Sequence, residues 1–294
     1  MAGANDRFRK MARAENFPVA GLLTPARLRP AVRALYAFAR VSDDIADDPR
    51  LGSSERLARL DAMKAALTAD AALAPSGSGT AIAVARSLRG ELAALAIDAA
   101  PAREFLLGLA VETSLTRIPD ADALMQISAM TASPLGRLMV MLHGVADESV
   151  LAAGGHLATA LQLLDHVQDC ASDYRRLDRV YLPADWLAWA GAGEDALAAP
   201  AASEGLRRVL DLCLDLADGE LVAAMPLLGP GVPRRLRLEA GLVHAMAGVL
   251  ARRLRRLDPV AGRIGLGWGG RISALVHWAG RWMRRLAAGA GQNR

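Results

Sequence analysis

Two acidic segments with helical spacing constrain the fold of this chain more than any other feature of its sequence. The first lies in ALYAFARVSDDIADDP and the second in LQLLDHVQDCASDYRR. Residues four apart lie on the same face of an α-helix, so Asp43 and Asp47 point one way, and Asp165, Asp169 and Asp173 form a column over two turns. The carboxylates are those of Asp43, Asp44 and Asp47 in the first segment and of Asp165, Asp169 and Asp173 in the second.

Such stacked carboxylates need a positive partner. Like charges four residues apart destabilise a helix by a few tenths of a kcal/mol per pair, and both segments are embedded in apolar sequence. Carboxylate oxygens suit Mg²⁺, which keeps several waters and bridges a few carboxylates to substrate phosphates. Together with nearby arginines, the two segments predict a Mg²⁺-dependent site that binds a diphosphate.

A purely structural interpretation of the same residues stays open at this point. Asp43 and Asp44 follow Ser42, and aspartate in a first helical turn is common as a cap or as a partner of the helix dipole. An acidic helix face can also simply be solvated. The presence of both segments, each flanked by arginine, favours the metal site.

The composition indicates an all-α protein. The chain has 294 residues, of which 53% are apolar and only 4% aromatic. Alanine and leucine dominate, whereas runs rich in valine, isoleucine, threonine and tyrosine are scarce, which favours helices over strands. The net charge is +4, and lysine occurs only at positions 10 and 64, so nearly all positive charge is arginine. Arginine is better suited than lysine to bidentate phosphate contacts.

Cysteine usage and the absence of an apolar leader predict a cytoplasmic protein. Cys170 and Cys213 match no metal or redox spacing and lie in apolar helical patterns, so we expect buried thiols in a reducing setting. The N-terminus has no apolar core of a secretory signal, and no apolar run approaches the length of a transmembrane helix.

Apolar periodicity predicts a series of helices separated by short breaks. Pro134 and, more weakly, Gly154-Gly155 interrupt the pattern, and Asp185 is expected to cap a helix after an extended segment at 179–183. The predicted helices span 31–46, 54–68, 81–97, 101–116, 120–130, 137–145, 157–173, 204–226 and 234–257.

The C-terminal stretch is basic and carries tryptophans. From Arg252 to Arg285 there are nine arginines and one aspartate, interleaved with Trp268, Trp278 and Trp282. Such a stretch can lie on an anionic membrane surface, which predicts possible peripheral contact with the inner membrane. A nucleic-acid patch, or the end of a core helix with a solvated tail, are the alternatives, and we expect no nucleic-acid partner.

Four motifs, in this order, resemble the squalene/phytoene synthase family: ENFPVAGLL, ALYAFARVSDDIADDP, ASPLGRLMV and LQLLDHVQDCASDYRRLDRVYLP. The resemblance covers about residues 15–285, and the ENFPV opening is most like the bacterial hydroxysqualene synthase branch. It implies an all-α isoprenoid synthase fold, a single helical bundle around a central cavity. We expect an N-terminal tail at 1–14, the helical domain at 15–257 and a basic, partly helical segment at 258–294.

The resemblance also implies roles for individual residues. The six aspartates named above would hold two or three Mg²⁺ ions, and Arg40, Arg117 and Arg179 would bind the diphosphate. Tyr36, Arg40 and Tyr181 would form the catalytic set. The cavity wall would consist of Ala132, Leu135, Gly136, Met139 and Leu164, for which plain helix packing is the alternative.

The implied reaction ionises presqualene diphosphate, rearranges the resulting cation and quenches it with water to give hydroxysqualene, with no need for NADPH. Two alternatives stay open. One is condensation of two prenyl diphosphates to presqualene diphosphate or phytoene. The other is a non-catalytic family member that acts as a partner or assembly protein.

Three positions depart from the family pattern. Asp165 stands where asparagine is usual, Glu112 where aspartate is usual, and Ile118 where a tyrosine associated with the head-to-head reaction is usual. An extra carboxylate at Asp165 could bind a metal more tightly or repel a diphosphate. His166 is expected to be a partly buried packing residue rather than a catalytic one.

Overall fold

The computed structural model describes residues 24–68, 79–267 and 278, and the regular structure of these residues is helical. The ENFPV motif and the predicted N-terminal tail lie outside the described residues. The α-helices are α2 (Arg29–Ala46), α3 (Ser53–Ala66), α4 (Thr80–Ala94), α5 (Ala100–Glu112), α6 (Ala121–Leu142), α7 (Glu148–Leu177), α8 (Ala184–Trp189), α9 (Glu204–Ala223) and α10 (Arg234–Arg256). Short 3₁₀ turns are η1 (Ala26–Leu28), η2 (Glu194–Ala198) and η3 (Met225–Leu228).

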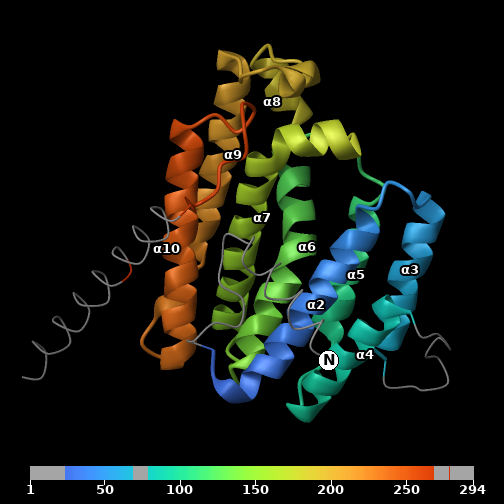
Figure 1. Ribbon diagram of the computed structural model, residues 1–294. Coiled ribbons are helices and arrows are strands. Elements are labelled where there is room, and N and C mark those ends of the chain that lie inside the picture. The colour runs from blue at the N-terminus through green and yellow to red at the C-terminus, as the bar shows by residue number, and fades with distance from the viewer. Residues whose placement is uncertain (1–23, 69–78, 268–277, 279–294) are drawn as a thin grey trace, which may run out of the picture.

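Helices α6 and α7 form the centre of the bundle (Figure 1). Helices α2 to α5 lie on one side of this pair, and α9 and α10 lie on the other. The apolar core accordingly has two parts, and α6 contributes to both, with Leu138 in one and Val140 in the other. The predicted all-α fold is confirmed, and it brings the C-terminal ends of α2 and α7 to the same end of the bundle (Figure 1).

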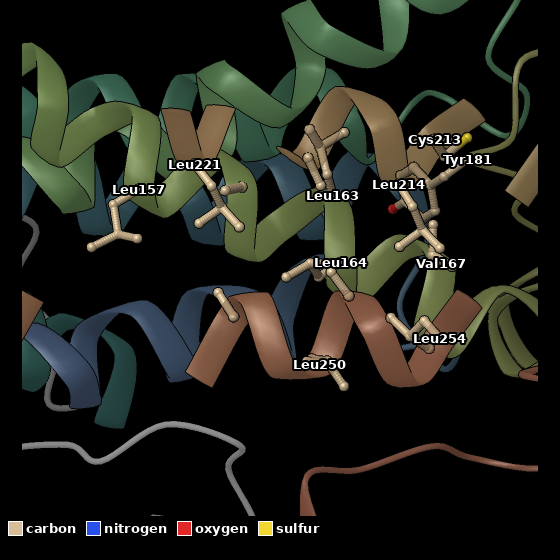
Figure 2. Packing of buried hydrophobic residues seen from close by; sticks show 14 of the residues in the cluster. Leu157, Leu163, Leu164, Val167, Tyr181, Cys213, Leu214, Leu221, Leu250 and Leu254 are labelled. Atoms are coloured by element: carbon tan, nitrogen blue, oxygen red, sulfur yellow. The ribbon is translucent and has the colours of Figure 1, made fainter. Parts of the chain in front are cut away.

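Helix α7 shows why this sequence forms one long central helix. Apolar residues recur every three or four positions along it, so it buries a continuous stripe. Figure 2 shows Leu163, Leu164 and Val167 of this stripe packed among leucines of α9 and α10. The side chain of Asp147 caps the first turn by accepting hydrogen bonds from the next turn, and Asp178 ends the helix in a left-handed conformation.

Two predicted helix interruptions are wrong. Pro134 lies inside α6, and the Gly154-Gly155 pair lies inside α7. Tertiary packing overrides the local signals, because α6 and α7 pack closely at Gly136 and Gly154, where a Cβ atom on Gly136 would clash with the Gly154 carbonyl. The glycines therefore serve helix contact rather than helix termination.

Other local predictions differ in smaller ways. Asp185 does not cap α8 by the expected geometry: Pro183 occupies the N-cap, and Asp185 lies in the first turn, where it accepts a hydrogen bond from the Trp186 amide.

Cys170 and Cys213 are buried thiols as expected, and burial raises the pKa of Cys170 to about 12. No helix among the described residues is long and apolar enough to cross a membrane.

The packed core continues beyond the last residue of α10. Val260, Ile264 and Leu266 are buried with the residues of α7, α9 and α10. The proposed boundaries after residues 14 and 257 stay predictions, although these contacts show that the first part of the C-terminal segment packs against the bundle. Trp278 also contacts α10, since its indole N–H donates to the Leu238 carbonyl at 3.1 Å.

Gly136→Ala should destabilise the protein, by about 1–3 kcal/mol, because the added methyl group forces α6 and α7 apart. The matched control is Gly90→Ala in α4, where a Cβ atom meets nothing within 4 Å. This control should stabilise the protein by about 0.5–1 kcal/mol through helix propensity. Urea unfolding followed by circular dichroism measures both. Equal effects of the two substitutions would show that the helix contact is not tight.

Candidate active site

The structure brings the first acidic segment to the C-terminal end of α2, where Asp43 points into the protein. Burial raises the pKa of Asp43 well above its usual range, and the charges of Glu112 and Asp47 raise it further. Arg40 opposes this effect and also pairs with the more exposed Asp44 at 3.2 Å. The carboxylates of this segment are therefore crowded, with one arginine beside them on the same helix.

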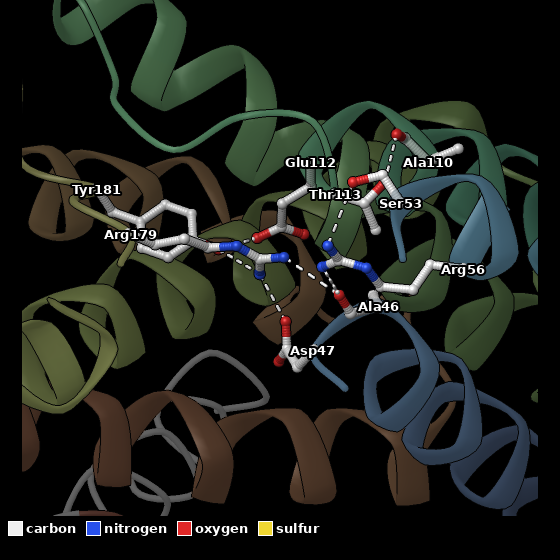
Figure 3. Close-up of polar contacts among 9 residues, drawn as sticks. All are labelled: Ala46, Asp47, Ser53, Arg56, Ala110, Glu112, Thr113, Arg179 and Tyr181. Carbon is white, nitrogen blue, oxygen red and sulfur yellow. Dashed lines mark hydrogen bonds and ion pairs between the residues drawn. The ribbon is translucent and has the colours of Figure 1, made fainter. Parts of the chain in front are cut away.

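Arg179, which follows α7, contacts the end of the first acidic segment (Figure 3). Its side chain is only 6% exposed, and its Nη1 donates to Asp47 Oδ1 at 2.5 Å. Its Nη2 donates to the carbonyl oxygen of Ala46, the last residue of α2, at 3.1 Å. The loop that follows α7 is thereby fixed to the end of α2.

Tyr181 and Glu112 complete this buried polar group. The Tyr181 hydroxyl donates to Glu112 Oε1 at 2.6 Å (Figure 3). Burial raises the pKa of Glu112, although the Tyr181 hydrogen bond and the charge of Arg179 lower it. The Tyr181 ring stacks on His166 with centroids 3.9 Å apart, and burial lowers the pKa of His166 to about 3. His166 is thus buried and neutral, more deeply buried than the sequence analysis expects, and its packing role stays a prediction.

The second acidic segment lies on α7. Burial raises the pKa of Asp173 to about 8, and the charges of Asp165, Asp169 and Asp47 contribute to this rise. The influence of Asp47 on Asp173 shows that the two segments lie close enough for their charges to interact. The two acidic segments therefore lie at the same end of the bundle, and their joint role in metal binding stays a prediction.

Arg263 is a site residue that the sequence analysis missed. Its Nε donates to Asp169 Oδ1 at 3.0 Å, and its side chain is 62% exposed. The neighbouring Ile264 carbonyl accepts a hydrogen bond from Gln168, which holds this loop against α7. No spacing rule could have found Arg263, because it lies 94 residues from Asp169 in the sequence.

The remaining sequence-predicted polar residues lie in different places. Tyr36 lies one turn before Arg40 on α2 and is half-buried. Arg117 forms ion pairs with Asp178 at 2.8 Å and Glu194 at 2.7 Å, and its backbone pairs with Val180 in an isolated parallel bridge. Through these contacts Arg117 holds the segment after α5 against the segment after α7. Its role in diphosphate binding stays a prediction.

An apolar cavity of about 250 Å³ lies between α6, α7 and α10. Leu135, Gly136 and Met139 line it, as the sequence analysis expected of the cavity wall. Ala132 and Leu164 are buried but are not among its lining residues, and Leu164 packs instead in the core (Figure 2). The sequence analysis missed the residues that α7 and α10 contribute, because helix packing alone decides which faces enclose space. These are Gly154, Leu157, Ala158, Leu161, Leu236, Glu239, Ala240 and Val243.

The carboxylates fit Mg²⁺ in one particular way. Within the described residues, no three acidic, histidine or cysteine side chains converge on a single point. Mg²⁺ is usually held by one or two carboxylates together with waters and substrate phosphates, rather than by an all-protein cage. Crowded carboxylates with raised pKa values, such as Asp43 and Asp173, are a donor set of this kind.

The chain resembles known proteins over most of its length. The squalene/phytoene synthase family model matches residues 11–268. A hydroxysqualene synthase of Rhodopseudomonas palustris is 34% identical over 264 residues, covering 87% of this chain and 85% of that protein. A hydroxysqualene synthase of Zymomonas mobilis is 31% identical over 252 residues, covering 85% and 82%. The crystal structure of squalene synthase HpnC from Alicyclobacillus acidocaldarius superposes with a TM-score of 0.70 at 26% identity, covering 89% of this chain and 96% of that one.

Asp173→Asn should stabilise the metal-free protein at pH 8 but not at pH 4. The folded protein holds the Asp173 proton up to about pH 8, whereas an unfolded chain releases it near the ordinary value of 3.8. The folded state therefore binds more protons between these values, so the contribution of Asp173 to stability falls as pH rises through this window. In EDTA, the melting temperature of the variant should exceed that of the wild type at pH 8 by at least about 2 °C.

Asp61→Asn is the control for the change of residue type, since Asp61 lies exposed on α3 beside Lys64. A melting-temperature difference for Asp173→Asn that is the same at both pH values would contradict the crowding of charges at this site.

Proposed function

Because the chain belongs to the squalene/phytoene synthase family, and is therefore a terpenoid synthase, we propose that it converts presqualene diphosphate to hydroxysqualene. The observation that carries this proposal is the pair of interacting acidic segments at one end of helices that enclose an apolar cavity further along. One end suits a diphosphate and the other suits a prenyl chain. The similarity to hydroxysqualene synthases supports the choice of substrate and product.

Mg²⁺, with two or three ions bound, is the proposed cofactor. Asp43, Asp44 and Asp47 would hold it on α2, and Asp165, Asp169 and Asp173 would hold it on α7. When bound, Mg²⁺ would supply Lewis-acid stabilisation of the departing diphosphate. The extra carboxylate of Asp165 adds negative charge to this set, so the site suits a metal-bound diphosphate better than a free one.

The arginines supply fixed positive charge for the same task. Arg179 is buried and held in place by Asp47 and the Ala46 carbonyl, so it needs little reorganisation when charge develops on the leaving group. Arg40, on the same face of α2 as Asp44, would contact the diphosphate from the other side. Arg117 stays a proposed diphosphate ligand, although its present partners are Asp178 and Glu194.

The cation formed by loss of the diphosphate needs an apolar surrounding that excludes all but one water. Leu135, Met139 and Leu161 offer such a surface along the cavity. Tyr36 and Tyr181 are the proposed aromatic residues beside the acidic segments, where Tyr181 is fixed by Glu112 and His166. Addition of water to the cation and loss of one proton give the alcohol, and we expect no need for NADPH.

The proposed setting is cytoplasmic, with possible peripheral contact to the inner membrane through the basic C-terminal segment. Most of that segment lies outside the described residues. One described residue of the segment, Trp278, donates a hydrogen bond to the Leu238 carbonyl on α10, so this tryptophan packs against the bundle. A membrane contact would therefore use the other basic and aromatic residues of the segment.

The purified protein should convert presqualene diphosphate to hydroxysqualene with Mg²⁺ and without NADPH, and EDTA should stop the reaction. Mass spectrometry of the extracted products measures this directly. Formation of presqualene diphosphate or phytoene from farnesyl or geranylgeranyl diphosphate would favour condensation instead. A product that appears only with NADPH would overturn the water quench.

Asp43→Asn and Asp169→Asn should each lower turnover by at least about 100-fold, because each removes a charge that the proposed metal site needs. Circular dichroism should show an unchanged fold in both. The exposed Asp61→Asn variant of α3 should keep full activity and serves as the matched control. Retained turnover in either site variant would contradict the proposed site.

A further inference from the structure

The apolar cavity has one charged lining residue, Glu239 of α10, and this residue has an unusual environment. The other lining residues are apolar or glycine. The Thr24 hydroxyl donates to Glu239 Oε1 at 2.8 Å, and Thr24 is completely buried. Glu239 Oε2 is buried and has no hydrogen-bond partner in the part of the chain that the structure describes. A buried carboxylate oxygen without a donor is costly, so its position calls for an explanation.

His143 faces this free oxygen. Its Nε2 lies 3.7 Å from Glu239 Oε2, and its side chain is 3% exposed. His143 Nδ1 lies 2.9 Å from the Met139 carbonyl, which can only accept, so Nδ1 carries the proton. His143 Nε2 also has no hydrogen-bond partner among the described residues. Glu239 Oε2 and His143 Nε2 thus face each other at the cavity wall, and a hydrocarbon chain offers neither of them a hydrogen-bonding group.

The Glu239–His143 pair lies at the cavity end that is remote from the aspartates. Helices α6 and α7 run antiparallel and meet at Gly136 and Gly154. His143 follows Gly136 on α6, so it lies beyond the level of Gly154, on the side away from Asp165. Asp165 and Gly154 are eleven residues apart on α7, a rise of about 16 Å. A chain anchored by its diphosphate at the aspartates would therefore run down the cavity toward this pair.

We propose that Glu239, backed by His143 and held by Thr24, is the end wall that sets the length of prenyl chain that the cavity accepts. This inference rests on the proposed function, since it assumes a prenyl diphosphate anchored at the acidic segments. The terminal methyl groups of a chain can pack against Leu236 and Val243 but offer no donor to Glu239 or His143. Each further isoprene unit would have to cover these polar atoms, which opposes binding of longer chains.

The test compares binding of the unreactive thiolodiphosphate analogues of farnesyl and geranylgeranyl diphosphate in the presence of Mg²⁺. Isothermal titration calorimetry gives the ratio of the two dissociation constants for each variant, and this ratio is insensitive to a partly unfolded fraction. Glu239→Ala should shift the ratio toward the longer chain by roughly tenfold, because it removes the polar wall and adds room for the extra unit. Glu239→Gln should leave the ratio close to that of the wild type, since the amide keeps the volume and polarity.

Val243→Ala is the matched control, because it removes apolar volume from the same cavity and leaves the polar pair intact. An unchanged ratio in Glu239→Ala, or an equal shift in Val243→Ala, would overturn the end wall while leaving the proposed function standing. Failure of the wild type to bind either analogue would overturn the end wall, whereas the proposed function is tested separately by turnover of presqualene diphosphate.

Discussion

The arrangement of the acidic end of this bundle depends on one buried ion pair, between Arg179 and Asp47. Arg179 comes from the loop after α7, whereas Asp47 ends α2, so the pair fixes the two acidic segments to each other. The guanidinium also lowers the pKa values of Glu112 and Asp173 through its charge. Breaking a buried pair of this kind leaves a charge without compensation, which is more costly than losing a surface pair. The same contact therefore serves the fold and gathers the carboxylates.

The two ends of the central helix pair have opposite chemical character. Near the C-terminal end of α7, carboxylates and arginines crowd together, and about four turns away the same helix lines an apolar cavity. The close approach of α6 and α7 at Gly136 and Gly154 determines how the two faces enclose this space. A single substrate with a charged head and a long apolar chain matches this gradient better than two separate ligands would.

Much of this organisation could be predicted from the sequence, because local periodicity carries it. Helical spacing predicts that Asp43 and Asp47 share one face and that Asp165, Asp169 and Asp173 share another, and composition indicates an all-α fold. The errors arose where distant residues decide the outcome. Pro134 and Gly154 were interpreted as breaks because a single sequence does not show that α6 and α7 pack against each other there. Arg263 and Glu239 reach their sites only through the fold, so no motif or spacing could have assigned them.

The crowded carboxylates at the acidic end of the bundle destabilise the metal-free fold when they are charged. Burial and mutual repulsion raise the pKa values of Asp43 and Asp173, so each would destabilise the fold if it carried its charge without a cation nearby. An apolar or amide side chain at either position would remove this cost. The charge of Asp165 raises the pKa of Asp173 further. Carboxylates that stay crowded at a cost in stability, on a helix whose other residues pack tightly, follow the pattern of residues kept for function rather than for folding.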